Sequence, residues 1–212
     1  MKKYLAMSST LIVAVIVVLN ATVFSQRKSS KTDAFHASLK QETAQEYAKS
    51  IQTLDAIYND NKDDYLLNLR LGWLHYLAKS YNESKKFYGN AVALSGNKSI
   101  EAMLARTLPL AALNDWDGVV STYNAILKLD PMNYTANLRL GQIYLNRAAY
   151  GEAKNYLQKA HVNFPGSYEP NLSLGWTYYY LGDKKNAEIL LTNALMLSPG
   201  DTLALEGLKL VR

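Results

Sequence analysis

The pentapeptide Asn68-Leu69-Arg70-Leu71-Gly72 occurs again, unchanged, as Asn137-Leu138-Arg139-Leu140-Gly141, and nearly so as Asn171-Leu172-Ser173-Leu174-Gly175. The interval between the first two copies is twice the interval between the last two, to within one position. A less similar copy is therefore expected between the first two. Such a fixed period predicts a chain of repeated supersecondary units that bury their apolar faces by stacking on one another.

Each copy begins the same longer pattern. Three positions after the glycine stands His75, Tyr144 or Tyr178, followed by a polar or glycine turn and a second, alanine-containing apolar segment. Breakers close the units, and the prolines among them, at positions 131, 165 and 199, recur at the same period. Proline lacks the N–H that would continue a helix, and glycine lets two helix backbones approach closely. Each unit is therefore predicted to be a helical hairpin.

The pattern resembles the tetratricopeptide repeat family, in which a Leu-Gly-x-x-Tyr element on the first helix pairs with alanine and aromatic positions on the second helix and a closing proline. The resemblance implies an all-α, right-handed superhelical solenoid of antiparallel helix pairs. It assigns four units to residues 65–99, 100–133, 134–167 and 168–200.

The second unit is degenerate. Arg106 and Thr107 stand where Leu-Gly is expected, and Pro109 lies inside the first helix. Proline removes a helical hydrogen bond, so this helix is expected to be kinked or shortened. Two roles remain open for the unit, a hinge and a binding feature.

The segments that flank the repeats are also predicted to be helical. Residues 26–64 are expected to form a flexible leader and one long amphipathic helix, which begins at Thr32 or Asp33 and ends near Asn59. Residues 201–212 are expected to form a capping helix that covers the last hairpin, as the end of a solenoid requires.

The N-terminal residues have the pattern of an export signal. Lys2 and Lys3 precede an apolar run from Leu11 to Leu19, and small residues follow, so residues 1–25 are predicted to be a cleaved signal peptide. The alternative is a retained anchor formed by residues 5–24, which are about long enough to cross a bilayer. Under either interpretation the repeats are expected to be exported, to the periplasm or another extracytoplasmic space.

Composition argues against several functional classes. The chain has no cysteine and three histidines, which fall on different predicted elements, so no catalytic residues, metal site or cofactor are expected. The net charge of +5 includes Lys2 and Lys3. The remaining charge is too mild to predict nucleic-acid binding.

The family resemblance implies that the first helices of the hairpins line a concave groove. The positions just before the leucine, just after the glycine and about four beyond it would face a partner. Aromatic and arginine side chains among them are typical anchors of protein interfaces. The tyrosines at 178–180 cannot all be core, because three successive residues point in different directions around a helix. The predicted partner-binding residues are Arg70, Trp73, Tyr76, Arg139, Gln142, Asn146, Trp176, Tyr179 and Tyr180, with Leu145 and Ser173 beside them.

These observations predict a non-enzymatic interaction scaffold or adaptor that binds a peptide segment or partner subunit in the groove. Arg70 and Arg139 would pair with acidic side chains of the partner. One alternative is a membrane-tethered structural component of an envelope complex, with membrane contact only through a retained N-terminal helix. Another is a small-ligand or glycan binder that uses the aromatic groove.

Overall fold

The computed structural model describes residues 30–212, and the predicted signal or anchor segment therefore lies outside the described residues. The described part contains eleven helices and no strand. The expected all-α fold class is confirmed. No helix among residues 30–212 combines the length and the apolar character needed to cross a bilayer.

The chain divides into two compact units, which meet at Asn61 and Lys62. The first contains a pair of helices, α2 (Lys31–Thr43) and α3 (Tyr47–Tyr58). The second contains the remaining nine described helices: α4 (Tyr65–Leu77), α5 (Tyr81–Leu94), α6 (Ile100–Ala112), α7 (Trp116–Leu129), α8 (Tyr134–Asn146), α9 (Tyr150–Asn163), α10 (Tyr168–Tyr180), α11 (Lys184–Leu197) and α12 (Thr202–Val211).

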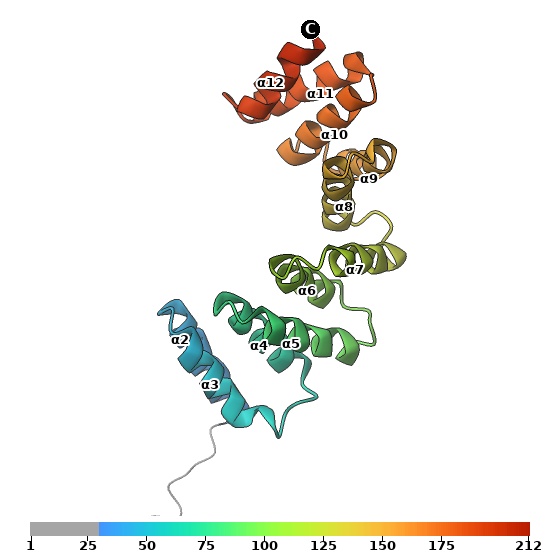
Figure 1. Cartoon of the computed structure of the whole chain (residues 1–212). Helices are drawn as coiled ribbons and strands as arrows, with labels where there is room; N and C mark the ends of the chain where they lie inside the picture. Colours follow the sequence, from blue (N-terminus) through green and yellow to red (C-terminus); the bar gives the residue numbers. More distant parts are fainter. Residues whose placement is uncertain (1–29) are drawn as a thin grey trace, which may run out of the picture. The chain divides into compact units, whose positions relative to one another are not determined.

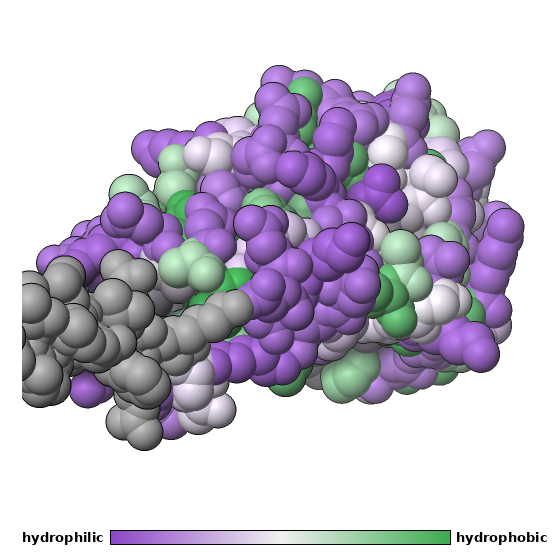
Figure 2. Space-filling model, turned by 90° about the horizontal axis from the view of Figure 1, so that it is seen from below, coloured by the Kyte–Doolittle hydropathy of each residue, from purple (hydrophilic) through white to green (hydrophobic). Residues whose placement is uncertain are grey.

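The second unit is a solenoid of helix pairs (Figure 1). Helices α4 and α5, α6 and α7, α8 and α9, and α10 and α11 form successive hairpins, each of which packs on the next. The last helix, α12, packs against α10 and α11. Figure 2 shows one face of the molecule, on which hydrophilic side chains prevail and apolar ones form separate patches.

The repeated glycines lie where the two helices of a hairpin meet. A Cβ atom added to Gly72 would come within 2.7 Å of the Tyr88 ring, one added to Gly141 within 2.4 Å of Leu157 Cγ, and one added to Gly175 within 2.9 Å of Leu191 Cγ. These separations are too short for any real Cβ contact. The predicted close approach of the helices is therefore confirmed in these three hairpins.

The asparagine of the pentapeptide holds the loop that precedes its helix. Asn68 is fully buried, and its amide nitrogen donates to the carbonyl oxygens of Lys62 and Asp64 at 2.7 and 2.8 Å. Asn137 and Asn171 repeat this arrangement with the carbonyls six and four positions before them. Each buried asparagine thus pairs a loop carbonyl six positions before it and adds a bond to the N-cap carbonyl, which in the cases of Asn68 and Asn137 also accepts the backbone N–H of the same asparagine.

The prediction of one long N-terminal helix is wrong. The chain turns between α2 and α3 at Gln45, whose φ of 61° lies in the left-handed region. The same backbone conformation recurs in the turn of every later hairpin, at Lys79, Asn114, Ala148 and Gly182. Only one of these five turns uses glycine, so no glycine marks the first turn in the sequence.

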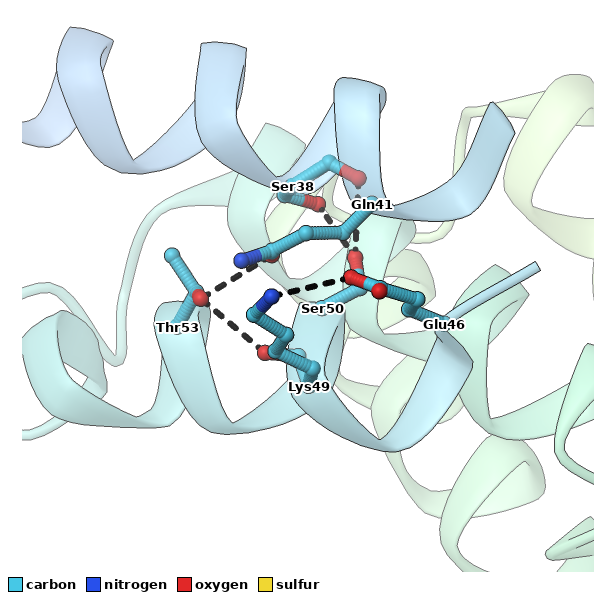
Figure 3. A network of polar contacts seen from close by, with 6 residues as sticks. All are labelled: Ser38, Gln41, Glu46, Lys49, Ser50 and Thr53. Atoms are coloured by element: carbon cyan, nitrogen blue, oxygen red, sulfur yellow. Dashed lines mark hydrogen bonds and ion pairs between the residues drawn. The ribbon is translucent and has the colours of Figure 1, made fainter. Parts of the chain in front are cut away.

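Serine replaces glycine in this first hairpin (Figure 3). Ser38 and Ser50 are both fully buried, and their hydroxyls lie 2.9 Å apart. The Ser50 hydroxyl also donates to the Ser38 carbonyl at 3.0 Å, as the Ser84 hydroxyl donates to the Gly72 carbonyl at 2.8 Å. Ser38 lies one repeat period before Gly72. The first hairpin thus has the internal spacing of the repeats.

A second group of polar contacts ties α2 to α3 at the surface of this hairpin. The Thr53 hydroxyl lies 3.0 Å from Gln41 Oε1 and 2.9 Å from the Lys49 carbonyl. Lys49 also forms an ion pair with Glu46 at 3.0 Å, at the start of α3 (Figure 3). Of these three contacts, the one between Thr53 and Gln41 joins the two helices, and the other two lie within α3 and its N-cap.

The degenerate unit forms a complete hairpin. Helix α6 has 13 residues, as α4, α8 and α10 do, so the expected shortening by Pro109 is wrong. Pro109 lies in the last turn, where the missing N–H affects a single hydrogen bond. This hairpin differs from the others in how its two helices pack. Thr107 occupies the place of the glycine, and its hydroxyl lies 3.4 Å from that of Tyr123. Helix α6 also contacts α7 less extensively than the paired helices contact each other in the other three hairpins of the solenoid.

Candidate functional site, a groove across four hairpins

Two hollows lie next to each other in the solenoid. The first has a volume of about 690 Å³ and is lined mainly by α8, α10 and α12. The second has a volume of about 400 Å³ and is lined by α4, α6, α7 and α8. Gln142 and Asn146 on α8 line both. The two hollows therefore form one groove, whose middle is the exposed face of α8.

The structure brings most of the predicted binding residues to this groove. Besides Gln142 and Asn146, the second hollow is lined by Tyr76 and Arg139. The first is lined by Trp176 and Tyr180, together with Leu145, Ser173, Ala148, Tyr150, Leu172, Leu203 and Glu206. Arg70, Trp73 and Tyr179 line neither hollow.

Other groove residues come from the degenerate unit, and sequence reasoning missed them. Leu108 and Trp116, which are 38% and 45% exposed, line the second hollow. The buried side chains of Thr107, Val119 and Tyr123 line it as well. Ala111 and Ala112 stand where the other units have larger groove residues, and they leave room. The register to Gly72 and Gly141 could have identified the two alanines, but Trp116 lies on a second helix, outside the expected face.

Aromatic rings form one wall of the first hollow. The Trp176 and Tyr180 ring centroids are 5.9 Å apart, and Tyr150 stacks on Tyr180 at 4.7 Å. The rings of Tyr179 and Trp176 pack edge to face, with their centroids 5.7 Å apart. Such contacts fix ring orientations before a ligand arrives. The Tyr180 side chain remains 49% exposed, so the expectation that the three consecutive tyrosines cannot all be core is confirmed.

The last helix, α12, also lines the first hollow, through Leu203 and Glu206. A Cβ at Gly207 on α12 would lie 2.7 Å from Leu191 Cδ1 and 3.3 Å from Trp176 Cζ2, so the glycine lets α12 approach both side chains. Tyr168 donates its hydroxyl to Asp201 at 2.6 Å and so ties α10 to the start of α12. Burial, and then this hydrogen bond, raise the pKa of Tyr168 to about 12, while the same bond lowers the pKa of Asp201.

The charges of the groove are unevenly satisfied. Arg139 donates to Glu169 at 2.9 Å and to the Gln142 side chain at 2.8 Å, so its charge is already paired within the protein. Glu206 lines the first hollow and forms no ion pair with any residue from 30 to 212. Within the same range no cluster of three or more His, Asp or Glu side chains could hold a metal ion.

Comparisons with known proteins agree with this architecture. Two tetratricopeptide repeat family models match residues 135–167 and 168–201. No curated protein gives a significant match.

Among solved structures, the fold is similar to a tetratricopeptide repeat protein from Parabacteroides merdae, with 17% identity over 85% of this chain and 71% of that one, at a TM-score of 0.73. It is also similar to YrrB, described as a tetratricopeptide repeat protein with an unusual peptide-binding site, with 16% identity over 89% and 97% at 0.69. MamA from Desulfovibrio magneticus gives 16% over 80% and 95% at 0.67. The two matched repeats, within a solenoid of helix pairs like those of these structures, show that the chain belongs to the tetratricopeptide repeat family.

Proposed function

We propose that this protein is a non-enzymatic scaffold that binds a peptide segment of a partner protein in the groove centred on α8. The observation that carries the proposal is the continuity of the two hollows at Gln142 and Asn146. Each hollow also offers an aromatic anchor, Trp116 in the second hollow and Trp176 in the first.

The chemistry of the groove supports a protein ligand. Tryptophan, tyrosine and arginine side chains are enriched among the residues that dominate interface energies, and all three types line this groove. The exposed amide of Asn146 on α8 can pair with the backbone of an extended peptide. Tetratricopeptide repeats are generally interaction scaffolds, and one similar structure, YrrB, is described by its peptide-binding site.

A blocking substitution tests the groove. Asn146 is exposed and lines both hollows, so Asn146→Trp should fill the middle of the groove without entering the core. Asn155→Trp is the matched control, because Asn155 is also an exposed asparagine, on α9 and outside the groove. Partner capture from native fractions should be lost with Asn146→Trp and kept with Asn155→Trp. Equal capture by both variants would refute the groove as the binding surface.

The compartment is a separate part of the proposal. The sequence of residues 1–25 supports export, and the repeats would then act in the periplasm or another extracytoplasmic space. N-terminal sequencing of the native protein tests this. A chain that starts near Gln26 supports a soluble exported scaffold, whereas a retained N-terminus in a membrane fraction supports the tethered alternative.

A further inference from the structure

The first hollow has an unmatched negative charge beside an aromatic wall. Glu206, which is exposed on α12, lines this hollow together with Trp176 and Tyr180 of α10. Glu206 has no cationic partner among the described residues. Aromatic faces attract cations through their quadrupole, and a nearby carboxylate adds to that attraction.

The charge of Arg139, the arginine among the residues that line the groove, is already compensated within the protein. Arg139 is held by Glu169 on α10 and by Gln142 on its own helix, at 2.9 and 2.8 Å. An acidic partner side chain would therefore compete with Glu169 for this charge. The charged group of the groove that has no counter-ion among the described residues is the carboxylate of Glu206, whereas the pairing of Arg139 with an acidic partner residue stays a prediction.

Resting on the proposed function, we infer that the first hollow binds an arginine side chain of the partner segment. Its guanidinium would stack against the wall of Trp176 and Tyr180 and pair with Glu206. Arginine fits better than lysine because its planar guanidinium stacks on rings and gives a carboxylate two parallel hydrogen bonds at once. Asn146, which makes no side-chain hydrogen bond with a described residue, can accept a third from the same group.

The test begins with an unbiased set of ligands. A random peptide display library is selected against the immobilised full chain, against Glu206→Gln and against Glu152→Gln. Glu152 is an exposed carboxylate on α9 outside the groove, so the control makes the same charge change elsewhere. We expect arginine to be enriched in peptides selected by the wild type and by Glu152→Gln, and the enrichment to disappear with Glu206→Gln.

A double-mutant cycle then assigns the contact. In a selected peptide, the arginine is replaced by citrulline, which keeps the shape and loses the charge. For the wild type the replacement should weaken binding about tenfold or more, and for Glu206→Gln it should change binding by less than about threefold. An equal loss in both proteins would overturn the inference, since the arginine would then contact something else.

The outcomes separate this inference from the proposed function. Peptides that lose binding with Asn146→Trp but show no arginine preference would leave the groove function standing and refute the arginine site. Peptides that bind all variants equally, or a selection that yields no binding peptide, would refute both. Selection of lysine as strongly as arginine would also contradict the inference, because a simple charge attraction would then explain the site.

Discussion

We predict that replacing Lys159 by asparagine, in the hairpin of α8 and α9, stabilises the protein, because a buried side-chain oxygen in this hairpin lacks the hydrogen bond that its counterparts make. In the hairpins α4–α5 and α10–α11 the side-chain oxygen of Asn68 accepts a hydrogen bond from Asn90 at 3.2 Å, and that of Asn171 accepts one from Asn193 at 3.3 Å. Both donors lie at the same spacing after the buried asparagine. At that spacing from Asn137 stands Lys159, and the Asn137 oxygen is buried without a hydrogen bond to any described residue.

The expected gain from Lys159→Asn follows from three contributions. A new neutral hydrogen bond to a buried acceptor contributes about 0.5–1.5 kcal/mol net to the free energy of unfolding. Asparagine is a poorer helix former than lysine, which costs about 0.4 kcal/mol within α9. Lys159 is exposed and forms no ion pair with a described residue, so its charge adds little. The net expectation is a stabilisation of about 0.1–1.1 kcal/mol, or an increase in Tm of up to about 4 °C.

Thermal and urea unfolding of the wild type, Lys159→Asn and Lys159→Ala measure this effect. Lys159→Ala removes the same charge but brings no donor, so it isolates the hydrogen bond once the better helix propensity of alanine, about 0.6 kcal/mol, is subtracted. The reasoning also requires that Asn193→Ala destabilise the chain by about 1–2 kcal/mol, because it would leave the Asn171 oxygen unsatisfied. If Lys159→Asn shows no advantage over Lys159→Ala after that subtraction, the account of the paired asparagines is refuted.

Three further predictions concern the hairpins. Gly141→Ala should destabilise the chain by about 1–3 kcal/mol in urea unfolding, despite the better helix propensity of alanine, because its methyl group would collide with Leu157; an increase in stability would contradict the close approach. Gly182→Val should cost about 1–2 kcal/mol, because its φ of 81° is unfavourable for a branched residue, and an unchanged midpoint would show that the turn relaxes. Tyr168→Phe should raise the pKa of Asp201 toward the ordinary value of 3.8, as an NMR titration of the carboxyl would show. Because the lowered pKa stabilises the native state only above the unfolded value, this contribution is lost as the pH falls below about 4, and the variant should differ from the wild type less at pH 2 than at pH 7.

The period of the sequence predicted those features that depend on local geometry. At a close helix contact no larger residue fits in place of glycine. Gly72, Gly141 and Gly175 therefore recur in the sequence and identify their hairpins. The register to these glycines also defines one face of each first helix. For that reason Gln142 and Trp176 could be assigned to the groove from the family resemblance alone, and the structure places both there.

Features in which another residue type takes the place of the usual one, or which join distant parts of the chain, could not be predicted from the sequence. In the first hairpin Ser38 performs the role of the glycine through a hydrogen-bonded serine pair, and Gln45 adopts the left-handed turn without being glycine. Neither leaves a recognisable pattern, which is why the apolar spacing predicted one long helix. The pairing of Arg139 with Glu169 joins side chains on different hairpins, and for that reason the sequence suggested a charge available to a partner.

In the degenerate repeat, the loss of the packing motif and the presence of the second hollow have one physical cause. Thr107 stands where a hydrogen atom is required for close contact, and its side chain meets Tyr123 on the facing helix. The two helices must therefore stay further apart than in the neighbouring hairpins. Thr107 and Tyr123 both line the second hollow, with Trp116 exposed beside them. A repeat with glycine at this position would pack its hairpin more tightly and fill the space that a partner side chain is proposed to enter. Of the two roles open to this unit, hinge or binding feature, the geometry thus supports the binding feature.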